Sequence, residues 1–223
     1  MDQLVKEFFA AATLGDVNGV KDAIAAGVNV NAKNDEGRTA LIKCAKRGRI
    51  QVTKLLIDAG ADVDCRDNNG KTPLMGACKR GYRECADLLI EAGADVNATD
   101  NNSNNSLMRA AYSGYDKIVR TLLQKGADIN ARDFSGRSAL MQACSAGNIE
   151  VVDVLISRGA NINLVDKMGC NALMRTAYLG YDELVKILVN NGADTKAQDI
   201  DGKTALDYYK MNNNNEETIA LLG

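Results

Sequence analysis

Glycine recurs every 33 residues along the chain, and this period constrains the fold more than any other feature of the sequence. The glycines form three columns, which begin at Gly15, Gly27 and Gly37 and end at Gly180, Gly192 and Gly202. Only the third column is interrupted, by Ser103. A fixed period of this length is typical of a repeat protein, in which each unit packs only against its neighbours.

Each period also contains the signals for two short helices. A residue that can cap a helix by accepting a backbone N–H recurs at the same step, as Thr39, Thr72, Asn105, Ser138, Asn171 and Thr204. A leucine follows each of these caps after two residues, and further apolar and small residues follow at helical spacing. The glycines predict where both helices end, and turns such as Asp67–Gly70 predict a hairpin-like tip between units.

The composition favours an all-α fold without catalytic chemistry. Hydrophobic residues make up 46% of the chain and aromatic residues only 4%, with one Pro and no Trp, so Ala, Leu, Ile and Val must build the core. Histidine is absent, which excludes Ser-His-Asp and Cys-His nucleophile pairs and the HExxH zinc helix. Because most glycines belong to the 33-residue columns, they form neither a GxGxxG nor a GxxxxGK phosphate-binding motif. We therefore expect no enzyme activity and no cofactor.

Each 33-residue period thus contains a helix, a tight turn, a second helix and a tip. This pattern, with Thr72-Pro73-Leu74 at the start of a first helix, resembles the ankyrin repeat. The resemblance implies an ankyrin-type solenoid of helix-turn-helix repeats, as a single domain over residues 1–223. Its units are residues 1–33 as an N-terminal cap, 34–66, 67–99, 100–132, 133–165, 166–198, and 199–223 as a C-terminal cap. Where the family usually has His, four units have Met, which predicts a more apolar core between the helices. The chain is equally compatible with a whole protein and with part of a longer one.

The six cysteines form no CxxC pair, and we expect them to be free thiols without a metal. Five of them share columns with small or apolar residues, which predicts burial, and only Cys170 falls on a tip as a candidate for modification. The acidic stretch Asp62–Asp67 lacks the ligand set of a calcium loop. The first residues do not resemble a signal peptide, and no window is apolar enough to span a membrane. We therefore expect a cytoplasmic protein.

The resemblance implies a concave partner-binding groove, made of the tips and of the first-helix residues opposite the leucine face. Lys and Arg greatly outnumber Asp and Glu in these columns, although the net charge of the whole chain is only −2. The candidate groove residues are Arg38, Lys46, Arg47, Lys71, Lys79, Arg80, Arg109, Tyr112, Phe134, Arg137, Met168, Arg175, Tyr178 and Leu179.

The candidate groove is basic in its first half and aromatic in its second. We therefore expect a non-enzymatic scaffold whose protein partner has an acidic segment and an apolar or aromatic segment. Three alternatives remain open at this stage: nucleic-acid binding through the basic residues, a targeting role within a longer enzyme or secreted effector, and a merely solvated face. Neither a small-molecule substrate nor a membrane is expected.

Overall fold

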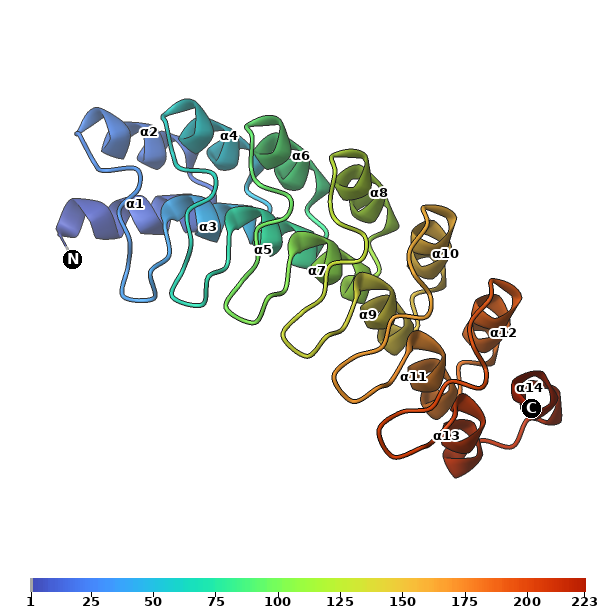
Figure 1. The fold of residues 1–223 in the computed structure, drawn as a ribbon. Coiled ribbons are helices and arrows are strands. Elements are labelled where there is room, and N and C mark those ends of the chain that lie inside the picture. Colours follow the sequence, from blue (N-terminus) through green and yellow to red (C-terminus); the bar gives the residue numbers. More distant parts are fainter. Residues whose placement is uncertain (1) are drawn as a thin grey trace. The chain divides into compact units, whose positions relative to one another are not determined.

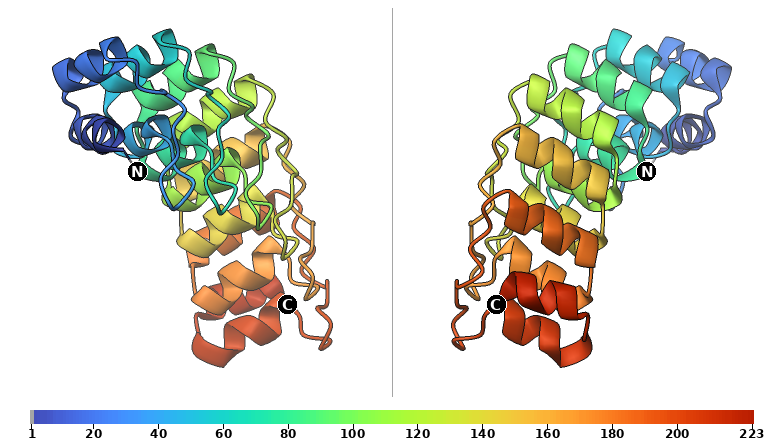
Figure 2. Two further views of the ribbon diagram at one scale, coloured as in Figure 1. Left: turned by 90° about the vertical axis from the view of Figure 1, so that its left-hand side faces the viewer. Right: turned by 90° about the vertical axis from the view of Figure 1, so that its right-hand side faces the viewer.

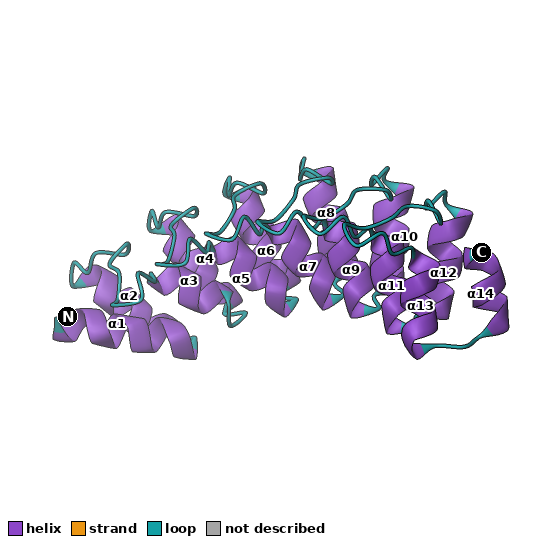
Figure 3. Ribbon diagram, turned by 60° about the horizontal axis from the view of Figure 1, so that its bottom comes forward, coloured by secondary structure: helices purple, strands orange, loops and turns teal. Residues whose placement is uncertain are grey.

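The computed structural model describes residues 2–223, which form fourteen α-helices joined by turns and no β-strand (Figures 1 and 3). The helices are α1 (Gln3–Leu14), α2 (Val17–Ala25), α3 (Ala40–Ala45), α4 (Ile50–Asp58), α5 (Pro73–Arg80), α6 (Arg83–Glu91), α7 (Ser106–Ser113), α8 (Asp116–Gln124), α9 (Ala139–Ala146), α10 (Ile149–Ser157), α11 (Ala172–Leu179), α12 (Asp182–Asn190), α13 (Ala205–Asn212) and α14 (Glu216–Leu222). The prediction of an all-α fold with two helices per period is confirmed.

The chain divides into two compact units, and each is described by itself. The first unit contains Met1–Ala110 and Thr121–Ala127, and the second contains Ala111–Arg120 and Asp128–Gly223. In the first unit, α1, α3 and α5 form one layer and α2, α4 and α6 form another (Figure 1). In the second unit, α9, α11 and α13 pack side by side, and the tips lie along one edge of the helices (Figure 2).

Side-chain caps begin the first helices as the sequence predicts. Each of the six capping residues accepts a hydrogen bond from the backbone N–H three residues later, at 2.9–3.3 Å. The seventeen glycines of the three columns all have positive φ, so both helices of a unit end in left-handed turns. Ser103 occupies the same conformation with a φ of 59°, and no other residue between 2 and 223 except glycine has a positive φ.

The core of each unit is aliphatic. The leucine column of the first helices is almost completely buried except at Leu206, which is partly exposed, and the alanine and cysteine columns are buried as well. Met75, Met108, Met141 and Met174 are each 1% exposed, which confirms the expected apolar environment where the family usually has His. Small residues in this core let neighbouring helices approach closely.

An aspartate begins every tip after the first and holds its turn together. Oδ1 of Asp67 accepts the backbone N–H groups of Asn69 and Lys71, both at 2.9 Å. The same pair of bonds recurs at the equivalent aspartates Asp100, Asp133, Asp166 and Asp199. Within each unit, neighbouring tips share a backbone bond, as between Asn68 N and Glu36 O at 3.0 Å. The tips are therefore ordered turns.

Candidate functional site

Seven of the predicted groove residues lie in the first unit. They are Arg38, Lys46, Arg47, Lys71, Lys79, Arg80 and Arg109, and we call them the basic surface. Lys46 and Arg47 follow the last turn of α3, Lys79 and Arg80 end α5, and Arg38 and Lys71 lie on successive tips. Three consecutive repeats therefore contribute cations to one face.

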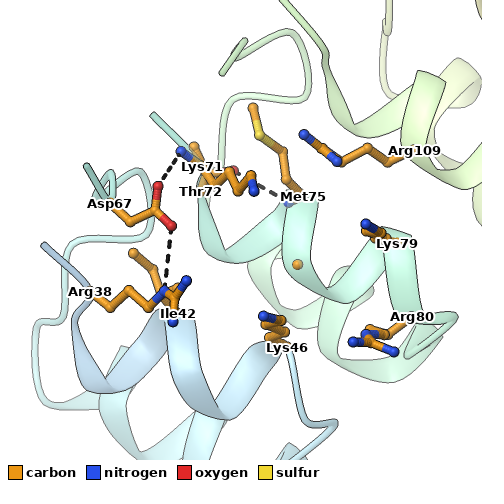
Figure 4. A pocket seen from close by; sticks show the side chains of 11 residues that line it. Arg38, Ile42, Lys46, Asp67, Lys71, Thr72, Met75, Lys79, Arg80 and Arg109 are labelled. Carbon is orange, nitrogen blue, oxygen red and sulfur yellow. Dashed lines mark hydrogen bonds and ion pairs between the residues drawn. The ribbon is translucent and has the colours of Figure 1, made fainter. Parts of the chain in front are cut away.

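Six of the seven cations line a single pocket with a volume of about 100 Å³ (Figure 4). In the close view, Lys46, Lys79 and Arg80 lie along one side of it, and Arg109 lies beyond Met75. The lining also includes Ile42, Met75 and Gly76, which have no charge. Arg47 instead lines a neighbouring recess together with Lys43 and Tyr82. The sequence predicted that these cations share a face, and the structure brings most of them into one concavity.

The cations of this pocket raise one another's electrostatic energy. Burial lowers the pKa of Lys46, and the charges of Arg38, Arg80, Lys71 and Lys79 lower it further. The pKa of Lys79 is lowered in the same way, by burial and then by Arg109, Lys71 and Arg80. Within residues 2–223, neither Lys46 nor Arg80 forms an ion pair with a carboxylate. Because like charges are concentrated here, an anion would bind favourably.

Other predicted cations are neutralised by the tip aspartates. Arg109 pairs with Asp100 and Arg175 pairs with Asp166. Arg137 pairs with Asp133 at 2.8 Å, and Arg38 lies 3.5 Å from Asp67. Because the tip aspartates balance part of the positive charge, the face is less basic than its Lys and Arg residues alone predict.

The burial of Asp100 illustrates how strongly these pairs are held. Burial opposes its negative charge, yet the backbone amides of Asn104 and Asn102 and the Arg109 guanidinium keep the pKa of the carboxyl below its ordinary value. A guanidinium that is paired in this way stabilises the tip and is less available to bind a partner.

The remaining candidates lie in the second unit and expose apolar area. Tyr112, Phe134, Met168, Tyr178 and Leu179 are 42–67% exposed, and we call them the aromatic surface. The ring of Tyr178 meets that of Tyr208 edge to face, with 6.1 Å between centroids. Lys167 Nζ lies 4.0 Å from the centroid of the Phe134 ring. Exposed aromatic and long apolar side chains at these positions are typical of interfaces.

The cysteines are where their columns predict. Five are buried, and burial raises the pKa of Cys44, Cys78 and Cys144 to about 12. Cys170 is partly exposed on its tip, but burial and nearby carboxylates raise its thiol pKa as well. A raised pKa leaves little thiolate at neutral pH, which argues against Cys170 as a reactive site.

In the part of the chain that the structure describes, no three His, Cys, Asp or Glu side chains are placed to hold a metal ion. No helix within residues 2–223 has the length and apolar character needed to cross a membrane.

Two features of the site were missed from the sequence. The first is the pairing of the tip aspartates with the groove arginines, which the shared 33-residue spacing of Asp67, Asp100 and the later tip aspartates could have revealed. The second is Gly76, which lies outside the three glycine columns and lines the basic pocket.

Paired helices, left-handed glycine turns and ordered tips define the chain as a helical repeat domain. A family model for ankyrin repeats in three copies matches residues 8–100, 107–199 and 140–223. The chain belongs to the ankyrin repeat family, which is generally non-catalytic and typically serves protein–protein interaction.

Solved structures agree with the family assignment. The ankyrin repeat domain of Bcl-3, a member of the IkappaB protein family, is 27% identical in sequence, with a TM-score of 0.83 over 97% of both chains. A search of curated protein sequences gave no significant match.

Proposed function

We propose that this chain is a non-enzymatic scaffold that binds a protein partner through the face formed by its first helices and tips. The observation that carries the proposal is the concentration of Lys46, Lys79 and Arg80 around one pocket of the first unit. Like charges brought this close destabilise the folded chain through mutual repulsion, so their presence on one face calls for a functional reason. A partner with an acidic segment would relieve that repulsion and be attracted from a distance.

The aromatic surface supports a second contact with the same kind of partner. Tyr112, Phe134 and Tyr178 leave large apolar areas in water, which a merely soluble surface would replace with polar residues. An apolar or aromatic segment of the partner would bury them. A rigid surface of ordered tips lowers the entropy cost of that contact, because few of its groups must be immobilised on binding.

The test is capture of partners from the source cell with the parent chain and a charge-reversed variant in parallel. The variant carries Lys46→Glu, Arg47→Glu, Lys79→Glu and Arg80→Glu. A matched control reverses four exposed cations on or beside the second helices, Lys21, Lys54, Arg83 and Lys125. We expect the first variant to lose the partner and the control to keep it.

Binding kinetics with the purified partner would distinguish long-range electrostatic attraction from direct contacts in the complex. Exposed charges act mainly on encounter, so the charge-reversed variant should associate more slowly and with a weaker dependence on salt. If both variants bound the partner like the parent, the basic surface would be the wrong face.

Nucleic-acid binding through the same cations would give a different result. Its affinity would fall steeply and linearly with the logarithm of salt concentration, with little sequence preference. Enrichment of nucleic acid in place of a protein by the parent chain would contradict the scaffold proposal.

A further inference from the structure

Gly76 breaks a pattern that every later tip follows. The residue nine places after each tip aspartate lies on the first helix of the same repeat. At the later tips, its side chain bonds to Oδ2 of that aspartate, in the pairs Arg109–Asp100, Gln142–Asp133, Arg175–Asp166 and Tyr208–Asp199. At the tip of Asp67 this position is Gly76, which has no side chain to offer.

The backbone dihedral angles of Gly76 do not require a glycine, although its close approach to Lys46 favours one. Gly76 lies within α5, it is not among the residues with positive φ, and glycine in a helix interior costs about 1 kcal/mol relative to alanine. A Cβ added to Gly76 would lie 3.2 Å from Cβ of Lys46, so a side chain here would enter the space beside that lysine. The missing side chain therefore opens the basic pocket.

The open pocket is strongly cationic even though Asp67 lines it. The Asp67 side chain is only 2% exposed, and Arg38 lies beside it at 3.5 Å. Five further cations line the same space: Lys46, Lys71, Lys79 and Arg80, together with Arg109, whose charge is balanced by Asp100. Burial and then repulsion from the neighbouring cations lower the pKa of Lys46 and of Lys79.

We propose that this pocket binds a phosphorylated serine or threonine side chain of the protein partner. The inference rests on the proposed function, and it specifies the chemistry of the acidic segment. A phosphoryl group carries a charge of about −1.5 to −2 and three strong acceptor oxygens, so it can bond to several cations at once. A glutamate offers one charge and two oxygens, which matches fewer of the groups around the Gly76 opening. Clusters of this kind are a recurring mode of phosphopeptide recognition.

The test uses the full chain and three degenerate peptide libraries that differ only in one fixed central residue: phosphoserine, glutamate or serine. Binding is measured by fluorescence polarisation. We expect the phosphoserine library to bind at least tenfold more tightly than the glutamate library, and the serine library to bind most weakly.

Gly76→Arg distinguishes binding inside the pocket from nonspecific attraction to its positive charge. The new side chain would fill the opening and could pair with Asp67 as Arg109 pairs with Asp100, while making the net charge more positive. We expect phosphoserine binding to weaken at least tenfold, although nonspecific attraction of anions would increase. Circular dichroism and thermal unfolding would establish that the variant is folded.

A second variant keeps the inference testable if Gly76→Arg does not fold. Lys46→Gln with Arg80→Gln should weaken phosphoserine binding at least tenfold, whereas the control Lys54→Gln with Arg83→Gln should stay within twofold of the parent. Lys54 and Arg83 are exposed cations of the second helices α4 and α6.

Several results would overturn the assignment. Equal binding of the phosphoserine and glutamate libraries would reject a phosphate site, yet it would leave the proposed acidic partner standing. Undiminished binding by folded Gly76→Arg would reject the pocket. A single-stranded RNA oligonucleotide that displaced the phosphopeptides, and bound Gly76→Arg as well as the parent, would indicate nonspecific attraction of polyanions. If no library bound, the phosphate inference would fail, and the proposed function would depend on the captured partner alone.

Discussion

Nε of Arg38 lies 3.5 Å from Oδ2 of Asp67, so a cation on one tip contacts the buried carboxylate of the next tip. The later tip aspartates all bond to a side chain of their own repeat, and among them Asp199 also accepts a bond from Cys170 Sγ of the preceding tip, at 3.9 Å. Asp67 therefore links two successive repeats of the first unit. It also places a negative charge beside the most cationic part of the molecule.

Replacing Asp67 should separate its two roles. Asp67→Ala removes the acceptor of two backbone N–H groups and should cost about 1–3 kcal/mol of unfolding free energy, because those groups lose their partner. Asp67→Asn keeps an acceptor oxygen and loses only the charge, so it should cost less. Denaturant unfolding of both variants measures the difference. An equal loss in both would mean that the ion pair with Arg38, and not the turn, supplies the stability.

We expect the tip that contains Ser103 to be the weakest of the first unit. Its left-handed conformation costs a residue with a Cβ about 1 kcal/mol, so Ser103→Gly should stabilise the protein by that amount. Gly202→Ser is the matched control, because a Cβ there meets nothing within 4 Å and the cost is purely conformational. It should destabilise the protein by a similar amount.

Hydrogen exchange tests the same tip without mutation. We expect the amides of residues 100–107 to be among the least protected of the internal tips, and we expect Ser103→Gly to raise their protection. Uniform protection of all internal tips in the parent would contradict this.

The buried thiols should make the protein sensitive to alkaline pH. The folded-state pKa values of Cys78 and Cys144 are about 12, against 9.0 for an unperturbed thiol. Since the unfolded chain releases these protons first, stability is fully present below pH 9 and is lost as the pH rises towards 12. The loss is about 1.4 kcal/mol per thiol for each pH unit.

Cys78→Ala with Cys144→Ala should therefore flatten the fall in unfolding free energy between pH 9 and pH 10.5, as measured by denaturant unfolding. Alanine is the residue that other repeats place in this column, so the fold should survive. Partner binding at neutral pH should be unchanged. Loss of binding by the folded variant would show that a thiol takes part in recognition.

Tyr112 and Tyr178 should act on dissociation of the partner. Truncation of either to Ala should weaken binding by about 1–2 kcal/mol through a faster off-rate, because buried aromatic anchors hold a complex after it has formed. Tyr181→Ala, which removes a 37% exposed ring at the start of α12, is the control and should leave the off-rate unchanged. Surface plasmon resonance at constant salt measures both rates. An unchanged off-rate for Tyr112→Ala and Tyr178→Ala would remove the aromatic surface from the interface.

Periodicity explains why most of the fold could be predicted. The fold depends on residues whose effects are local, such as the cap Thr39, the core residue Leu41 and the turn residue Gly48. Each of these signals recurs from repeat to repeat, so the pattern is easy to recognise in the sequence. The basic pocket depends on a side chain that is missing. Gly76 is informative only once the structure shows that Arg109 and its equivalents reach the tip aspartates. The tip aspartates do recur every 33 residues in the sequence, but only this recurrence, and no pattern within one repeat, points to their pairing with a residue nine places later.

The glycine at position 76 also bears on how such a pocket can arise and disappear. Glycine and arginine codons can differ by a single nucleotide, and an arginine here would supply the side chain that the later tips already use. One point mutation could therefore close the opening at the cost of a small shift of Lys46, and the reverse change could create it. A recognition site of this kind can be gained or lost by a lineage in one step, while the scaffold beneath it is inherited unchanged.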